Sequence, residues 1–509
     1  MAQFISGSVL ILFVVLIVWI GVISRNKATT VEGFFLGGRK IGPWLSAFAY
    51  GTTYFSAVIF VGYAGMFGWN TGVGGMWIGL GNGLIGCLLA WVVLAKPTRR
   101  MTHKLSARTV PELLERRYLS RGMKLYAAVI IFIFLVPYAA SVYKGLGALF
   151  SSIFGASPTI CIAIVAVITA VYLVLGGYVA TALNDLIQGI IMVVGLAAMI
   201  AILVTRPEVG GFVEGTARLA AINPELTNFF SMSNFKILLP NIILTSLGVW
   251  GMPQMVHKYY AIKDVGSIKT ATIVATFFSL FIGVGAYFNG SLSRLFIQAN
   301  DKGLPNVEGG FDGVIPKLLM DILGQGFFQN ILLGVIMLLL LSASMSTLAS
   351  VVLSSSSAVS IDLIQEIKHD ISQKAQLIIL RVLCLTFVGF SYIFATMNIS
   401  FIVNLMSFSW GIVAGSFIGP YLWGLYCKWI TKAGAWAGLL SGLSVVSIML
   451  IYNTSTIGFN AAKGLAPIMG ISAMFVSLAV VPLVSLATRK YETAHTDFVF
   501  SVAADEAAA

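Results

Sequence analysis

The chain has 509 residues, of which 58% are hydrophobic and 10% are charged. Soluble globular domains carry about 25% charged residues, so this composition excludes a soluble protein. The formal net charge is +12, but the positive side chains stand in short segments between apolar stretches, which is typical of membrane topology rather than of nucleic-acid binding. We therefore expect an all-α polytopic membrane protein that contacts the lipid bilayer and no nucleic acid.

The apolar stretches predict thirteen transmembrane helices, because about 20 apolar residues cross a bilayer core. In chain order they cover residues 4–23, 44–66, 75–95, 125–150, 159–175, 186–204, 237–256, 270–296, 328–359, 377–397, 401–425, 435–452 and 466–485. An odd number places the two termini on opposite sides. The segments 206–236 and 299–325 are the only sizeable polar loops, which leaves no room for a catalytic domain.

The distribution of Lys and Arg predicts the orientation. The loop 96–124 is strongly basic, and Arg25, Lys27, Arg39 and Lys40 crowd the first loop. Since cytoplasmic loops carry the excess of positive charge, we place the N-terminus outside and the C-terminus in the cytoplasm, in the plasma (inner) membrane. The same side then receives the remaining basic loop residues His257, Lys258, Lys263, Lys368, Lys374, Lys428, Lys432, Arg489 and Lys490.

Signatures of enzymes are missing from the sequence. Residues 81–86 match G-x-G-x-x-G, but they lie inside an apolar span without a preceding strand, where close helix packing is the better explanation. The four cysteines are isolated and lack metal-ligand spacing. No Walker A loop and no H-E-x-x-H motif occurs. We expect no catalytic activity.

A run of hydroxyl residues occupies the ninth span. Residues 341–362 read LSASMSTLASVVLSSSSAVSID and follow an apolar stretch. Small oxygen ligands on one helix face suit a hard cation such as sodium, whereas isolated helical hydroxyls commonly bond back to their own helix.

Two spans are interrupted at membrane depth. Gly51 to Ser56 breaks the second span, and Gly248 to Pro253 breaks the seventh. Broken helices are tolerated there only where they line a cavity. Interruptions five spans apart point to inverted repeats with a binding site at the midplane, although each break alone is compatible with an ordinary kink.

Several motifs resemble the sodium/solute symporter family, and the resemblance covers nearly the whole chain. They are Glu32 to Arg39 with Gly42-Pro43-Trp44, Gly176-Gly177-Tyr178, Asn184 to Gly189, and Met345-Ser346-Thr347. The resemblance implies thirteen transmembrane helices with a LeuT-type core of 5+5 inverted repeats. It divides the chain into a first helix and loop (1–43), a first repeat (44–205), a second repeat with outer loops (206–429) and two C-terminal helices with a tail (430–509).

The resemblance also implies the ion ligands. One sodium ion, as the coupling ion, would lie between the second and ninth spans, held by the carbonyls of Thr52, Phe55 and Ala343 and the hydroxyls of Ser346 and Thr347. Asp185 aligns with an acid that takes part in a second sodium site or an exit route in relatives, while its alternative role is a helix cap. Lys144 could attract a carboxylate substrate or extend to the outer surface.

The resemblance places the solute pocket by analogy of position. The candidates are Tyr54, Tyr138, Thr245, Val249, Trp250, Ser407 and Trp410. In the proline-transporting branch an Asp stands at the position of Tyr54, and a Trp and a Tyr replace Thr245 and Val249. Motifs around Thr53 to Ala57 and Leu183 to Asp185 are nearer the pantothenate-transporting branch.

We therefore expect a sodium-coupled secondary active symporter that imports a small organic solute, which is a pantothenate-, monocarboxylate- or proline-like carboxylate, by alternating access. A monomer suffices for transport. The alternatives are a carrier of a neutral solute such as a sugar, or a cation channel; only a carrier concentrates its solute.

Overall fold

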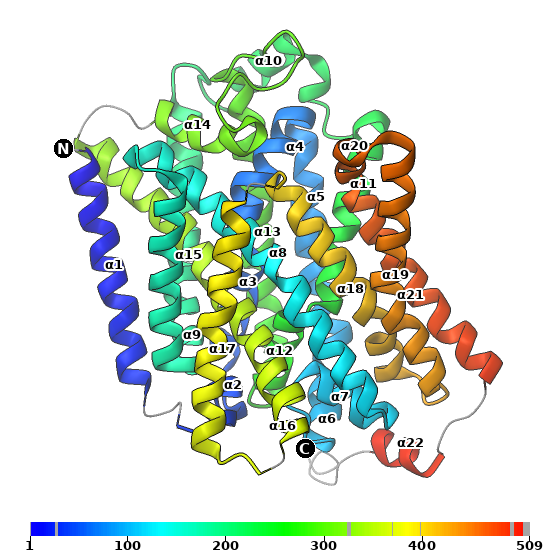
Figure 1. Ribbon diagram of the computed structural model, residues 1–509. Helices are drawn as coiled ribbons and strands as arrows, with labels where there is room; N and C mark the ends of the chain where they lie inside the picture. Colours follow the sequence, from blue (N-terminus) through cyan, green and yellow to red (C-terminus); the bar gives the residue numbers. More distant parts are fainter. Residues whose placement is uncertain are drawn as a thin grey trace.

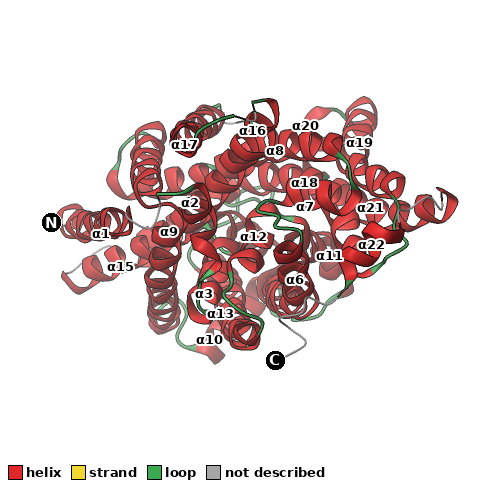
Figure 2. Cartoon of the chain, turned by 90° about the horizontal axis from the view of Figure 1, so that it is seen from below, coloured by secondary structure: helices red, strands yellow, loops and turns green. Residues whose placement is uncertain are grey.

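The computed structural model describes residues 2–25, 29–322, 327–368, 370–397, 399–488 and 493–501. The regular elements of the described chain are all helices, joined by loops that contain two isolated β-bridges, as Figures 1 and 2 show. The predicted cytoplasmic residues Lys27, Arg489 and Lys490 lie outside the described residues.

The helices follow one another with short connections. The first half of the chain contains α1 (Ala2–Ser24), α2 (Val31–Leu36), α3 (Pro43–Tyr54), α4 (Ala64–Thr71), α5 (Met76–Gly81), α6 (Lys96–Lys104), α7 (Val110–Tyr118), α8 (Arg121–Phe154), α9 (Pro158–Thr205), α10 (Phe212–Ile222) and α11 (Met232–Leu247). The second half contains α12 (Pro253–Ala261), α13 (Gly266–Ser291), α14 (Val314–Ile322), α15 (Phe327–Ser357), α16 (Gln365–Ile367), α17 (Gln373–Thr396), α18 (Ile402–Tyr426), α19 (Lys432–Ile457), α20 (Phe459–Gly464), α21 (Ala466–Thr488) and α22 (Thr493–Phe500).

Eleven helical segments of the described chain are long and apolar enough to cross a membrane, compared with the thirteen spans expected from the sequence. Two of them, Val58–Lys104 and Pro158–Thr205, have 47 and 48 residues. A single crossing needs about 20 residues. Each long segment is interrupted by a glycine with positive φ, Gly72 at 55° and Gly177 at 56°, a conformation that side chains other than glycine rarely adopt. The sequence pattern placed connections at both points.

Both expected helix breaks are present. α3 ends at Tyr54, the backbone of Phe55 is extended, and helical structure resumes in η3 (Val58–Tyr63). α11 tightens into a 3₁₀ turn, η8 (Gly248–Gly251), and after the extended residue Met252 the chain starts α12 at Pro253. Proline fits the first turn of a helix, because an N–H group at that position has no hydrogen-bond partner within the helix.

Burial separates an inner set of helices from an outer set. In the apolar 18-residue stretch of Asn330–Ile367 and of Ile402–Tyr426, 78% and 89% of the residues are buried, whereas the share is only 28% in Gly7–Ser24 and 33% in Gln373–Thr396. Figure 1 shows α1 at one edge of the bundle. The apolar side chains left exposed on the outer helices suit contact with lipid. α15 is therefore a central helix, and it packs against α9, α8, α3 and α1.

The two ends of the bundle differ in charge. α10 and α14 cover the upper end in Figure 1, and α6, α7, α16 and α22 lie at the lower end. The basic segment 96–124 forms helices α6 and α7 at this lower end and is not an open loop. Its charges pair with the end of the ninth span, since Arg121 lies 2.7 Å and Lys124 lies 2.8 Å from the Glu366 carboxylate.

Close helix contacts depend on glycine at defined points, and α4 gives the sharpest test. A Cβ atom added to Gly68 would stand 2.2 Å from the backbone carbon of Gly290 on α13, whereas a Cβ at Gly389 on α17 meets nothing within 4 Å. We expect Gly68→Ala to separate α4 from α13 and to lower the melting temperature of the detergent-purified protein by several degrees. Gly389→Ala is the matched control and should melt like the wild type. Equal melting temperatures for both variants would contradict this packing.

Candidate functional site

The broken helix α3 is held by polar side chains of α15. The Ser344 hydroxyl accepts a hydrogen bond from the Ala57 amide at 3.0 Å. On the other side of the break, the Ser346 hydroxyl donates to the Thr52 carbonyl at 2.8 Å, and the Thr347 hydroxyl donates to the Thr53 carbonyl at 3.0 Å. Backbone groups released by a break must find partners inside a membrane protein. The hydroxyl-rich sequence of α15 supplies them.

The same contacts gather a cluster of uncharged oxygen atoms. The hydroxyls of Ser346 and Thr347 each lie 3.1 Å from the carbonyl oxygen of Ala343 on their own helix, and Thr347 also reaches the Thr52 carbonyl at 3.3 Å. All of these residues are fully buried. We name Thr52, Thr53, Ala343, Ser346 and Thr347 the oxygen cluster.

Four of the five expected sodium ligands thus lie together in the oxygen cluster. The fifth, Phe55, is the extended residue that ends α3, and its amide donates to the Gly51 carbonyl at 3.2 Å. The Thr53 carbonyl was missed by sequence reasoning, although its place beside Thr52 in the break was a usable signal.

The donor chemistry of the oxygen cluster fits a monovalent hard cation. Hydroxyls carry two lone pairs and can turn their protons away when a cation enters. Carbonyls and hydroxyls are ligands that hard cations accept. None of the five residues of the oxygen cluster carries a charge, which suits a monovalent ion.

Asp185 lies inside α9 and does not cap it. It comes eight residues after the interruption at Gly177 and is 1% exposed. A capping residue would stand at the start of the helix. No hydrogen bond of standard geometry reaches the Asp185 carboxylate oxygens within the described part of the chain, although the Thr52 side chain of the oxygen cluster lies near them. The electrostatic partner of Asp185 is Lys258.

Lys258 and His257 are not loop residues, contrary to the expectation from the charge pattern. They belong to α12, and they are only 1% and 5% exposed. The His257 ring bonds the Phe35 carbonyl at 2.8 Å. The charge pattern failed here because α12 is the second half of a broken helix that runs through the protein interior.

Three of the predicted solute-binding side chains form an aromatic cluster beside the break in the seventh span. The Trp410 ring on α18 stacks near Tyr54, with centroids 6.4 Å apart, and meets Tyr138 edge-on at 5.6 Å. A Cβ at Gly248 would lie 3.2 Å from the Trp410 ring. The three rings come from α3, α8 and α18, which the sequence keeps far apart.

The other predicted pocket residues lie around this aromatic cluster in different ways. The Thr245 carbonyl accepts the Tyr54 hydroxyl at 2.7 Å, and the Thr245 hydroxyl donates to the Asn82 side chain at 2.7 Å. Val249 is 1% exposed. The Trp250 indole donates to the Ile85 carbonyl at 3.0 Å, so its polar edge is engaged by the third span.

Ser407 lies one helical turn before Trp410 on α18. Its hydroxyl donates to the Val403 carbonyl at 2.7 Å and lies 3.4 Å from the Tyr63 hydroxyl. It therefore flanks the aromatic cluster on the side of η3. Asn82 is a polar residue near this region that sequence reasoning missed.

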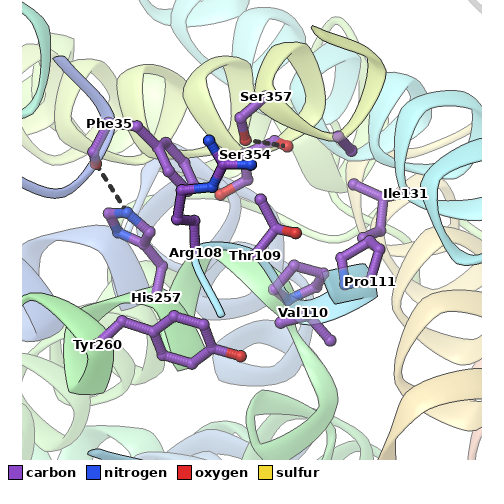
Figure 3. A pocket seen from close by; sticks show the side chains of 12 residues that line it. Phe35, Arg108, Thr109, Val110, Pro111, Ile131, His257, Tyr260, Ser354 and Ser357 are labelled. Carbon is purple, nitrogen blue, oxygen red and sulfur yellow. Dashed lines mark hydrogen bonds between the residues drawn. The ribbon is translucent and has the colours of Figure 1, made fainter. Parts of the chain in front are cut away.

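A small cavity lies on the lower side of the break in the seventh span. It is lined by Pro253, His257 and Tyr260 of α12 and by Ser354 and Ser357 of α15. Figure 3 shows these serines facing Thr109 and Arg108 across the cavity. Ser354 stands seven residues, or two turns, after Thr347 on α15. The cavity thus lies along the same helix as the oxygen cluster.

Lys144 is engaged at the upper end of the bundle. Its ammonium lies 3.2 Å from the Asp312 carboxylate and donates to the Ser400 carbonyl at 2.6 Å. Asp312 is in η10 (Gly310–Gly313), next to α14. These contacts agree with a side chain that extends to the outer loops, and they leave the carboxylate-binding alternative without support.

Comparison with known proteins assigns the fold and the family. The sodium:solute symporter family matches residues 34–442. The high-affinity proline transporter PutP of Bacillus subtilis (strain 168) is 27% identical over 464 residues, which cover 90% of this chain and 95% of that protein. The sodium/proline symporter of Staphylococcus aureus (strain JH9) is 29% identical over 488 residues, which cover 94% and 91%. These relatives are proline transporters, so the resemblance to the pantothenate-transporting branch gains no support from them.

Two solved structures have the same fold. A sodium-coupled sialic acid symporter in a substrate-bound, outward-open state has a TM-score of 0.75 at 18% identity, covering 95% of this chain and 98% of its own. MhsT in complex with L-phenylalanine has a TM-score of 0.51 at 17% identity, covering 87% and 98%. Since the family match extends over most of the chain, this protein belongs to the sodium:solute symporter family and is a multi-pass, sodium-coupled transporter rather than an enzyme.

Proposed function

We propose that this protein imports a small organic carboxylate together with sodium by alternating access. The observation that carries the proposal is the oxygen cluster, which joins the broken second span to the ninth span. Sodium bound there holds α3 against α15 and thereby completes the neighbouring solute pocket. Coupling is reciprocal, so the solute tightens sodium binding by the same factor.

The solute pocket proposed here is the aromatic cluster with Thr245, Val249, Trp250 and Ser407 around it. Tyr54 belongs to the same break as Thr52, so ion and solute share one flexible element. The half-helix that begins at Pro253 has the positive end of a helix dipole within the bundle, which suits a carboxylate. The relatives named for proline are consistent with a proline-like solute. A neutral solute is the alternative, since none of the pocket side chains is charged.

The proposed topology is thirteen crossings, with the second to eleventh forming 5+5 inverted repeats at residues 44–205 and 206–429. The eleven apolar segments of the described chain support this number. Val58–Lys104 is divided at Gly72 and Pro158–Thr205 at Gly177, so each counts as two crossings. With the basic lower end in the cytoplasm, the N-terminus is outside in the plasma membrane. Residues 1–43 and 430–509 are accessory to the repeats. A monomer contains both proposed sites.

The driving force is sufficient for accumulation. One positive charge that moves inward through 100 mV contributes about 2.3 kcal/mol, which corresponds to roughly 50-fold accumulation. The purified protein in proteoliposomes should therefore concentrate radiolabelled L-proline, or another carboxylate from a panel, against its gradient when sodium is applied. Solute movement that only follows its own gradient would identify a channel instead.

The ion site predicts a defined loss of sodium affinity. Ser346→Ala with Thr347→Ala removes two ligands, each worth about 1 kcal/mol or more, so the sodium concentration for half-maximal uptake should rise at least tenfold. The matched control is Thr169→Ala with Ser441→Ala, which removes two other buried hydroxyls that donate to carbonyls of their own helices. Its sodium dependence should match that of the wild type. An unchanged sodium dependence in the Ser346/Thr347 variant would rule out the oxygen cluster as the sodium site.

The break in the seventh span predicts a separate effect on the solute. Gly248→Leu places bulk against the Trp410 ring, so solute affinity at saturating sodium should fall about tenfold or more, while sodium affinity without solute changes little. Calorimetry in detergent measures both. Gly389→Leu, at the open position on α17, is the control. If Gly248→Leu instead weakened sodium binding and left solute binding intact, the assignment of sodium to the second-span break and of solute to the seventh-span break would be wrong.

A further inference from the structure

A buried lysine lies next to the proposed sodium site. Lys258 on α12 is 1% exposed, and its ammonium donates to the Ser350 hydroxyl at 3.0 Å and lies 5.1 Å from the centre of the Tyr178 ring. A lysine at this depth is costly unless its charge is balanced. It therefore needs an opposite charge nearby.

Asp185 supplies that charge. The two groups are each other's electrostatic partner, and both are 1% exposed. Within the described residues, no hydrogen bond of standard geometry reaches the oxygens of the Asp185 carboxylate. Removing one member of a buried pair is strongly destabilising, whereas removing both is often tolerated. Among the described residues no direct ion pair joins the two groups, so each charge offsets the other through the interior and not through a salt bridge.

Ser350 connects this pair to the oxygen cluster. It stands one turn after Ser346 and Thr347 on α15, and its hydroxyl also lies 2.9 Å from the Thr53 hydroxyl. The Thr53 carbonyl in turn accepts the Thr347 hydroxyl. A carboxylate and a serine hydroxyl beside the sodium site are themselves suitable cation ligands. In this chain the cation bonded to that serine is the ammonium group of Lys258.

The geometry points to Lys258 as a tethered cation that takes the place of a second sodium ion between Asp185 and Ser350. The inference rests on the proposed function, because it concerns an ion site beside the oxygen cluster. Its consequence is that the wild-type protein binds one sodium ion, at the oxygen cluster. Neutralising Lys258 while keeping Asp185 creates a second site.

Counting bound sodium tests this directly, with sodium alone as the probe. Saturation binding of ²²Na⁺ to the purified protein should give one ion per chain for the wild type and for Lys258→Arg, and two for Lys258→Met. The double variant Asp185→Asn with Lys258→Met should return to one. Two ions on the wild type, or one on Lys258→Met, would overturn the inference and leave sodium coupling intact. If the variant that lacks both the Ser346 and Thr347 hydroxyls still binds one sodium ion per chain, the oxygen cluster is not the sodium site.

Thermal unfolding gives a second, independent measurement should Lys258→Met fold poorly without sodium. The double variant should then be more stable than Asp185→Asn, because no charge is left unpaired. Added sodium should raise the melting temperature of Lys258→Met more than that of the wild type, since a second ion binds only to the variant's folded state. A double variant no more stable than Asp185→Asn would contradict the charge pair.

Discussion

The break in the second span can exist only because another helix replaces its missing hydrogen bonds. Unpaired amides and carbonyls cost several kcal/mol each in an apolar interior. α15 meets this requirement with Ser344, Ser346 and Thr347, which bond the backbone on both sides of the break. The arrangement fixes α3 against α15, one of the two most buried long helices, beside the proposed solute pocket.

The proposed ion and solute sites share this break. Thr52 and Thr53 present carbonyls to α15, while the next residue, Tyr54, presents its ring to Trp410 and its hydroxyl to Thr245. A change at the proposed ion site therefore reaches the proposed solute site through the adjacent residues Thr53 and Tyr54. The seventh span contributes the opposite wall, where Gly248 lets the helix approach the Trp410 ring. The two broken helices thus lie on either side of the proposed pocket, next to the unbroken helices α15 and α18.

Charge is handled differently at the two ends and in the middle. At the upper end Lys144 contacts Asp312, and at the lower end Arg121 and Lys124 contact Glu366. Of these side chains only Arg121 is largely exposed. Asp185 and Lys258 lie deep in the bundle, where separation is expensive. The end charges thus form direct ion pairs, whereas Asp185 and Lys258 act on each other only through their charges.

The sequence by itself determined the class of protein and the two helix breaks, and it named four of the five residues that the structure gathers in the oxygen cluster. Apolar length, Gly and Pro at membrane depth, and a dense run of hydroxyls are local signals with direct physical meaning. Tertiary structure alone decided that Lys258 and His257 are interior residues, that the Trp250 indole bonds Ile85, and how the rings of Tyr54, Tyr138 and Trp410 pack against one another. The reason is that the sequence around a charged or aromatic residue does not show which residue will contact it. Here the contacting residue lies on a helix far away in the chain.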